Sequence, residues 1–345
     1  MSSNIPRPVS SPSRFSVLLD SNLWRYVIDE CAGGALVRHA RQGKTNILIA
    51  PAVVYEALRL KNGALRDAIV RLMTNSAFRR LMPEAYSESM ELLRAIEWAH
   101  PEWLRPEPDL QFFNRLLNDW KKTTGGFWVR CKKAPEREAQ YLETMEGAMI
   151  QGAQAQAINA RREMIDANWK RNPSMDKTVV AFNSPIPGWR GDPFEAWRMD
   201  SLTVLTHSLK QTGNPYRDWI APFVELDTGL LESAAWIEFW VYLADKRTMP
   251  RQWLRWACSF AQRFRRVTPG TPGDSQLCTY FLEADAVVTA DKILLQILEE
   301  IRPYAPRNLP LGRLVPAGAP GVSSLLTYLA EAEDKMTAGA SLEKT

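Results

Sequence analysis

The amino-acid sequence predicts an α/β protein with a parallel sheet that is interrupted by a large all-α insertion. At both ends of the chain, short apolar runs typical of buried strands alternate with helical patterns. Between Asn62 and about Val267, nearly every segment has a helical pattern instead. Because strand–helix–strand units favour parallel pairing, we expect the two ends to form one sheet around the insertion.

The first elements follow a proline- and serine-rich arm, residues 1–14, which we expect to be flexible. Phe15–Leu19 is a short apolar run of buried-strand type, and Leu23–Gln42 has a helical pattern. Asn46–Ala50 is a second strand-like run, and the Pro51 after it suits the first turn of a helix. This order predicts a βαβ unit followed by a further helix.

The middle of the chain is predicted to be helical on both sides of one long loop, Asn172–Pro193, which contains four prolines. The predicted helices are Ser87–Ala99, Asp109–Lys122, Pro135–Trp169, Phe194–Gln211, Gly229–Asp245 and Pro250–Arg266.

The alternating pattern resumes after the turn Thr268–Gly273. We expect a helix at Asp274–Ala284, because the dipole at its N-terminus favours the Asp274 carboxylate. The elements predicted after it are the strand Ala286–Thr289, the helix Lys292–Ile301, the strand Gly312–Val315 and the helix Ser323–Lys335.

Composition adds little to this organisation. The formal net charge of +4 is too small to indicate a nucleic-acid-binding protein by itself, although the excess of Lys and Arg lies within residues 101–273. The predicted domains are a flexible arm of residues 1–14, an α/β domain of residues 15–61 plus 268–335, a helical insertion of residues 62–267 and a flexible tail of residues 336–345.

The chain has features typical of a cytoplasmic protein. Its N-terminus is polar and lacks the apolar segment of a signal peptide. The longest apolar run, Leu230–Ala244, is interrupted by Glu232 and Glu238, so we expect no membrane association. The four cysteines form no CxxC pair, and we expect reduced, partly buried thiols rather than a zinc site or a disulfide framework.

Four acidic residues are the candidate catalytic and metal-binding groups: Asp20, Glu56, Asp274 and Asp291. In a parallel α/β sheet, functional groups gather beyond the carboxyl ends of the strands, where Asp20, Glu56 and Asp291 belong. Converging carboxylates repel one another unless a cation joins them. The pattern therefore indicates a site for Mg²⁺ or Mn²⁺, which take oxygen ligands and activate water toward a phosphodiester.

The four residues suggest a division of roles. We expect Asp20 and Asp291 to be direct metal ligands, and Glu56 and Asp274 to bind a second ion or to orient the attacking water. The supporting polar residues are Ser21, Asn22 and Thr289. Asp285 precedes its strand, where a turn residue is expected, and is left out of the set.

The segments that carry these residues resemble the PIN-domain nucleases. They are Leu18-Leu-Asp20-Ser-Asn22, Ala52-Val-Val-Tyr-Glu56, Gly273-Asp274 and Val287-Val-Thr289-Ala-Asp291. The resemblance covers roughly residues 15–60 and 273–302, and the long insertion departs from the usually compact family. It implies a three-layer α/β/α fold and metal-dependent hydrolysis of RNA by the four carboxylates.

Two basic clusters are candidate nucleic-acid-binding groups: Arg251, Arg255, Arg263, Arg265 and Arg266 in the helix before the second acidic segment, and Lys132 and Lys133 farther back. Such cations contact phosphates, and Trp128, Trp253 and Trp256 nearby offer surfaces for stacking bases. The alternative is that the cations lie on solvated helix faces and the tryptophans in the core, which we favour for the tryptophans.

The sequence thus predicts a Mg²⁺- or Mn²⁺-dependent endoribonuclease. Because many PIN-domain proteins are toxins of toxin–antitoxin systems, the resemblance also implies a toxin or defence role and an inhibitory antitoxin partner. Two alternatives stay open: a nuclease that acts on structured or single-stranded DNA, and a nucleic-acid- or protein-binding scaffold with an inert α/β core.

Overall fold

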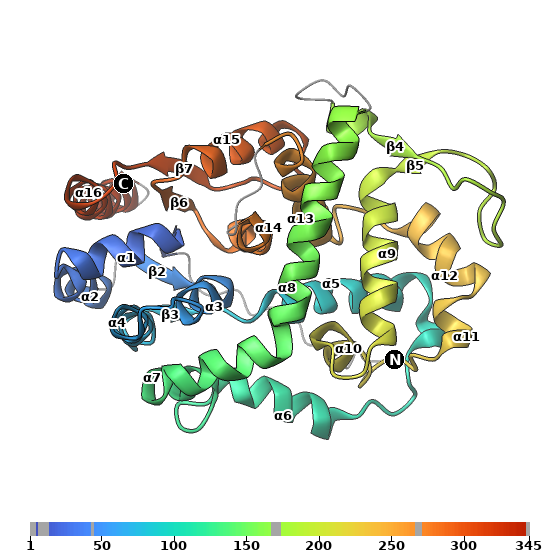
Figure 1. Cartoon of the computed structure of the whole chain (residues 1–345), viewed down its shortest axis with the longest axis horizontal. Coiled ribbons are helices and arrows are strands. Elements are labelled where there is room, and N and C mark those ends of the chain that lie inside the picture. Colours follow the sequence, from blue (N-terminus) through green and yellow to red (C-terminus); the bar gives the residue numbers. More distant parts are fainter. Residues whose placement is uncertain (1–4, 6–13, 43–44, 167–173, 266–270, 343–345) are drawn as a thin grey trace.

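The two ends of the chain meet in one five-stranded parallel sheet, as Figure 1 shows. The computed structural model describes residue 5 and residues 14–42, 45–166, 174–265 and 271–342. The strands lie in the order β3-β2-β1-β6-β7. They are β1 (Phe15–Leu19), β2 (Thr45–Ile49), β3 (Arg79–Arg80), β6 (Ala286–Thr289) and β7 (Leu311–Leu314).

The central strand β1 joins the N-terminal and C-terminal halves of the sheet. Val17 is in register with Ile47 on one side and with Ala286 on the other, and all three are fully buried. Such a strand is buried on both faces, which explains why the sequence shows an unbroken apolar run there. The predicted α/β class, the parallel sheet and the pairing of the two ends are confirmed.

Helices from both ends of the chain cover the sheet. The C-terminal helix α16 packs against β1, β2, α1 and α2, whereas α15 packs against β6 and β7. This arrangement is compatible with three α/β/α layers. The covering helices are α1 (Ser21–Asp29), α2 (Gly33–Gln42), α3 (Pro51–Leu58), α4 (Gly63–Met73), α14 (Thr271–Thr279), α15 (Lys292–Ile301) and α16 (Ala319–Leu342).

Several boundaries differ from the prediction. The single helix predicted at Leu23–Gln42 is two helices, because the chain turns at Cys31, whose φ of 52° is left-handed, and the glycine pair that follows favours a helix poorly. The strand β3 was not predicted, since two arginines carry no strand signal. Its pairing with β2 extends the sheet to Arg80, beyond the predicted domain boundary at residue 61. The last helix continues to Leu342, past the predicted end at Lys335.

The remaining helices come from the middle of the chain, and in Figure 1 most of them lie on the far side of the long helix α8 from the sheet, whereas α7 lies below the sheet. They are α5 (Glu84–Ala99), α6 (Leu110–Lys121), α7 (Phe127–Lys133), α8 (Pro135–Asp166), α9 (Ala196–Lys210), α10 (Pro215–Ile220), α11 (Thr228–Leu231), α12 (Ala234–Glu238) and α13 (Pro250–Gln262). Shorter elements are the 3₁₀ turns η1 (Pro101–Trp103), η2 (Met175–Lys177), η4 (Tyr280–Glu283) and η5 (Arg302–Tyr304), the π-helical η3 (Phe239–Leu243), and the antiparallel pair β4 (Val179–Val180) and β5 (Phe194–Glu195).

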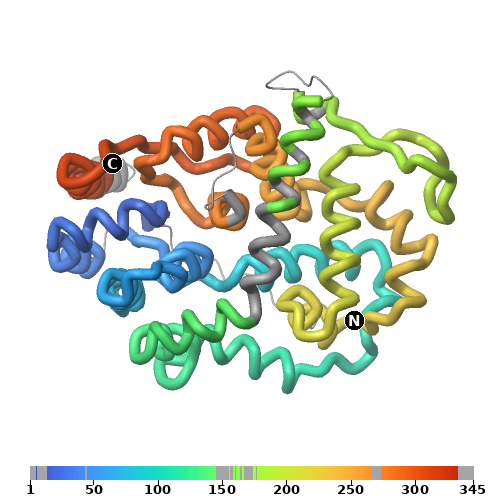
Figure 2. The backbone as a smooth tube through the Cα atoms, in the orientation of Figure 1, coloured from blue at the N-terminus to red at the C-terminus, as the bar shows by residue number. Residues whose placement is uncertain are grey.

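The helical half shares one hydrophobic core with the sheet. A single cluster of buried residues runs from Val17 in β1 to Trp253 in α13 and Leu325 in α16. Figure 2 shows the blue N-terminal and red C-terminal segments together on one side and most of the middle of the chain on the other. None of the helices in the described part of the chain is both long and apolar enough to cross a membrane.

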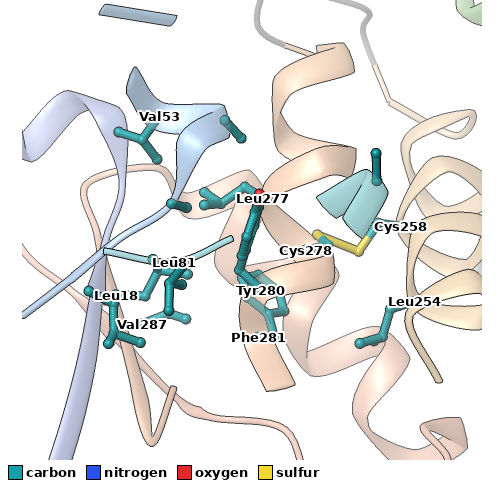
Figure 3. Packing of buried hydrophobic residues seen from close by; sticks show 14 of the residues in the cluster. Leu18, Val53, Leu81, Leu254, Cys258, Leu277, Cys278, Tyr280, Phe281 and Val287 are labelled. Atoms are coloured by element: carbon teal, nitrogen blue, oxygen red, sulfur yellow. A yellow bond between two sulfur atoms is a disulfide. The ribbon is translucent and has the colours of Figure 1, made fainter. Parts of the chain in front are cut away.

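A disulfide joins the two halves, which corrects the prediction of reduced thiols. Cys258 of α13 and Cys278 of α14 are bonded, with their Cα atoms 6.7 Å apart, in the packed interface that Figure 3 shows. The disulfide could not be predicted from the spacing of the cysteines, because the packing of α13 on α14 brings the two residues together. Cys31 and Cys131 are free.

Candidate active site

The end of β1 places Asp20 at the centre of the predicted acidic site. Its carboxylate is 4% exposed and accepts hydrogen bonds from the backbone N–H of Ser21 at 2.7 Å and from the Thr289 hydroxyl at 2.8 Å. The Asn22 amide lies 3.4 Å from the same carboxylate. Ser21, Asn22 and Thr289 thus occupy the supporting positions that the sequence suggested.

The neighbouring strand β6 brings Asp291 to the same edge of the sheet. Asp20 donates its backbone N–H to the carbonyl of Val288, so β1 and β6 end side by side. The hydroxyl that binds Asp20, that of Thr289, also accepts the backbone N–H of Asp291 at 2.8 Å. Asp291 then caps α15, because its Oδ1 accepts the N–H of Ile293 at 2.6 Å.

Glu56 and Asp274 come from two helices that pack closely together, α3 and α14. Pro51 begins α3 directly after β2, as predicted, and Glu56 lies on its second turn. Gly273 precedes Asp274 in the first turn of α14, and a Cβ atom there would stand 2.0 Å from Oε1 of Glu56. An alanine there would force the Glu56 side chain to move, so the glycine lets Glu56 lie against the start of α14.

The four carboxylates are close enough to act on one another electrostatically. Burial and the charges of the other three carboxylates raise the pKa of Asp274 to about 8. Burial also raises the pKa of Asp20 and of Glu56, and hydrogen bonds from Thr289 and Ser21 oppose the two increases. The fold thus brings the four predicted residues near enough for the charges of Asp20, Glu56 and Asp291 to act on Asp274.

The helical half contributes to this cluster through Gln262, which sequence reasoning missed. Its amide Nε2 lies 3.4 Å from Oδ2 of Asp274, and its Oε1 accepts the Ser275 hydroxyl at 2.7 Å. Ser259 in turn donates its hydroxyl to Ser275 at 3.1 Å. Gln262 and Ser259 lie on α13, the helix whose arginines were predicted to bind nucleic acid. A glutamine or a serine on such a helix has no sequence pattern that indicates a site.

Asp285, which was left out of the predicted set, lies at the opposite edge of the sheet. Its carboxylate accepts the backbone N–H of Ser16 at 2.7 Å, and its own N–H donates to the carbonyl of Ser16 at 2.8 Å. Both contacts are at the start of β1, whereas Asp20 follows its end. Asp285 fixes the register of β1 and β6.

The donor set suits a hard divalent cation, because all four groups are carboxylates and their repulsion favours a positive ion. Within the part of the chain that the structure describes, however, no three His, Cys, Asp or Glu side chains are already gathered as the ligands of one metal ion.

The arginines of α13 do not form the predicted phosphate-binding face. Arg251 pairs with Glu91 and Glu283, and Arg255 pairs with the fully buried Glu88 at 2.9 Å. Their side chains are only 16% and 15% exposed. These cations serve as internal partners for glutamates of α5, which the sequence did not reveal because the two helices lie about 160 residues apart.

The other predicted nucleic-acid-binding residues have varied surroundings. Arg265 is 7% exposed and pairs with Glu300 at 2.5 Å, and Arg263 lies 3.8 Å from Asp200. Lys132 and Lys133 are exposed at the end of α7. Arg266 lies outside the described residues, as do residues 268–270 of the predicted turn, residues 167–169 of a predicted helix and most of the predicted N-terminal arm.

The tryptophans near these cations belong to the core, as the favoured interpretation held. Trp128, Trp253 and Trp256 are at most 3% exposed, so their faces are not available for stacking bases.

Comparison with known proteins finds no match to a family model, to a curated protein or to a solved structure.

Proposed function

We propose that the protein is a Mg²⁺- or Mn²⁺-dependent phosphodiesterase, an endoribonuclease whose α/β core resembles a PIN domain. The observation that carries this proposal is the convergence of Asp20, Glu56, Asp274 and Asp291 at the carboxyl edge of one parallel sheet. A fold gains no stability from placing Asp274 where burial and three neighbouring carboxylates raise its pKa, so the convergence supports a functional cause.

The residues have distinct parts in this proposal. Asp20 and Asp291 are the proposed direct ligands, with Glu56 and Asp274 on the opposite helices as ligands of a second ion or as groups that orient water. Divalent ions held there would supply positive charge and would lower the pKa of a bound water. Thr289 holds the Asp20 carboxylate and the Asp291 backbone in fixed relation, and Gln262 holds Asp274.

The choice of RNA rests on the resemblance to PIN-domain nucleases, as does the proposed toxin or defence role with an inhibitory protein partner. DNA, structured or single-stranded, is the alternative substrate for the same chemistry. The two exposed lysines of α7, Lys132 and Lys133, are the proposed phosphate contacts that the structure leaves accessible.

A cleavage assay tests the proposal. Labelled single-stranded RNA and single-stranded DNA are incubated with the purified protein in Mn²⁺ or in EDTA. We expect cleavage of RNA in Mn²⁺ only. Asp20→Asn should lower the rate at least about 100-fold, since even outer-shell partners of metal ligands commonly contribute 10–100-fold.

The matched control is Glu30→Gln, because Glu30 is an exposed carboxylate at the far end of α1 from Asp20. It should cleave as the wild type does. Cleavage that survives EDTA or persists in Asp20→Asn contradicts the metal mechanism. Absence of cleavage of either nucleic acid contradicts the proposed activity and favours the inert scaffold.

A further inference from the structure

A polar cavity with an excess of positive charge lies away from the acidic site. It has a volume of about 240 Å³ and lies between β3, one face of α5, the start of α13 and the 3₁₀ turn η4. Four arginines line it, Arg79, Arg80, Arg94 and Arg251, against one carboxylate, Glu283. Leu81 and Tyr280, which Figure 3 shows, belong to its wall.

The positive charge of this cavity is only partly neutralised. Arg251 is held by Glu91 and Glu283. By contrast, neither Arg79 nor Arg80 forms an ion pair with any carboxylate among the residues that the structure describes. Arg79 is exposed, so its guanidinium is accessible to a ligand.

Arg80 is held in place without using all its hydrogen-bond donors. Its Nη2 donates to the carbonyl of Thr74 at 2.9 Å, and its guanidinium lies over the Trp128 ring, 5.4 Å from the centroid. Neither partner is an anion. Burial lowers the pKa of Arg80, as expected for a partly desolvated charge. Burial lowers the pKa of Arg94 as well, although the carboxylates of Glu91 and Glu97 oppose that decrease. A bound anion would offset this cost.

The cavity and the acidic site lie at opposite ends of α14. Asp274 is in the first turn of that helix and Tyr280 follows its last residue, which at 1.5 Å per residue separates them by about 9 Å along the axis. On the sheet, the cavity borders the outer strand β3, whereas Asp20 ends the central strand β1. The two sites share no residue.

We propose that this cavity binds a phosphate group. The guanidinium groups come from an edge strand, from α5 and from α13, so they approach from several directions. A tetrahedral phosphate carries acceptor oxygens in several directions, which suits donors that approach from different elements. The Ser87 hydroxyl on the cavity wall offers a further donor.

The phosphate has two potential sources, a small molecule or the 5′ end of a nucleic acid, and both present the same group. The proposal stands apart from the proposed nuclease activity, because it needs none of the four carboxylates.

Calorimetric titration with inorganic phosphate in EDTA, at constant ionic strength, tests the proposal. We expect saturable binding that weakens at least about tenfold in Arg79→Ala, since this substitution removes a charge-assisted hydrogen bond to the phosphate. The Arg79 side chain forms no ion pair with the residues that the structure describes, so this variant should keep the thermal unfolding of the wild type. Arg41→Ala, which removes an exposed arginine of α2, and Asp20→Asn should both bind phosphate as the wild type does.

A second pair of titrations identifies the source, by comparing 5′-phosphorylated with 5′-hydroxyl single-stranded RNA in EDTA. Tighter binding of the phosphorylated strand that is lost in Arg79→Ala assigns the cavity to a nucleic-acid end, and equal binding of the two strands assigns it to a small phosphate. Absence of saturable phosphate binding, or equal binding by wild type and Arg79→Ala, overturns the proposal. Unchanged phosphate binding with no nuclease activity would overturn the proposed function alone.

Discussion

At the scale of single residues, the site depends on the hydroxyl of Thr289 and on the space that Gly273 leaves. Thr289 donates to Asp20 and accepts from the backbone of Asp291, and thereby links the ends of two strands that lie 269 residues apart in the sequence. Gly273 leaves room for Glu56 beside α14. Neither residue carries the proposed chemistry, yet both decide whether the carboxylates meet.

The electrostatic cost of the cluster predicts that removing Asp274 stabilises the metal-free protein. The pKa of Asp274 is raised from 3.8 to about 8, so its carboxylate binds a proton more tightly in the folded state than in the unfolded state. The wild type should therefore lose stability as pH rises from about 4 to 8. Asp274→Asn should have a higher free energy of unfolding at pH 8, by about 1–3 kcal/mol after allowance for partial exposure.

Urea denaturation in EDTA at pH 5 and pH 8 measures this difference. The stabilisation should be larger at pH 8, and Glu30→Gln should show none. An Asp274→Asn variant less stable than the wild type at pH 8 would mean that the carboxylates do not repel one another as inferred.

At the scale of elements, the close packing of α3 and α14 predicts that Gly273→Ala lowers the cleavage rate. The added methyl group would meet the Glu56 carboxylate, so either the helices separate or Glu56 turns away. We expect the cleavage rate to fall at least about tenfold, because misplacement by 1 Å costs catalysis heavily. Gly34→Ala in α2 is the control: its Cβ would meet only the end of Arg38, at 3.9 Å, and alanine favours helix. Equal cleavage rates in the two variants would contradict this account.

The buried ion pairs between α5 and α13 predict that Arg255 acts on stability. Arg255→Met leaves Glu88 buried without its cation and should cost about 3–5 kcal/mol at pH 8. Because the pKa of Glu88 is already raised to about 7, the cost should shrink at pH 5, where Glu88 is protonated. Arg247→Ala breaks an exposed pair with Asp245 and should cost less than about 1 kcal/mol. Urea denaturation at both pH values distinguishes this role from a surface role in RNA binding, which would leave stability unchanged.

At the scale of the whole molecule, apolar runs were enough to predict four of the five strands and the meeting of the two chain ends in one sheet, but not β3 or the contacts between the sheet and the helical half. The strands Phe15–Leu19 and Ala286–Thr289 were predicted with their observed bounds, because buried parallel strands leave unbroken apolar runs. The strand β3 was missed because its two arginines are at the sheet edge, where burial imposes no pattern. A strand of two residues is recognised from its pairing with β2 in the structure, and its own sequence has no strand pattern.

The candidate site could also be predicted only in part. Asp20 and Asp291 could be identified because Asp20 follows β1 directly and Asp291 follows β6 after one residue, positions that local patterns reveal. Gln262, the Cys258–Cys278 disulfide and the ion pairs of α13 depend on how helices pack, which spacing along the chain does not encode. The arginines of α13 were assigned to a surface because a charged residue on an amphipathic helix is usually solvated, whereas here α5 supplies buried carboxylates to meet them.

The central claim is that two distant parts of the chain form one cation site, and a calorimetric titration with Mn²⁺ tests it most directly. The wild type should bind Mn²⁺ saturably, and Glu30→Gln should bind it equally well. Asp20→Asn, from the N-terminal half, and Asp274→Asn, from the C-terminal half, should each weaken binding at least about tenfold, because each removes a proposed ligand. Mn²⁺ binding that is absent from the wild type, or that survives both substitutions unchanged, would contradict the account.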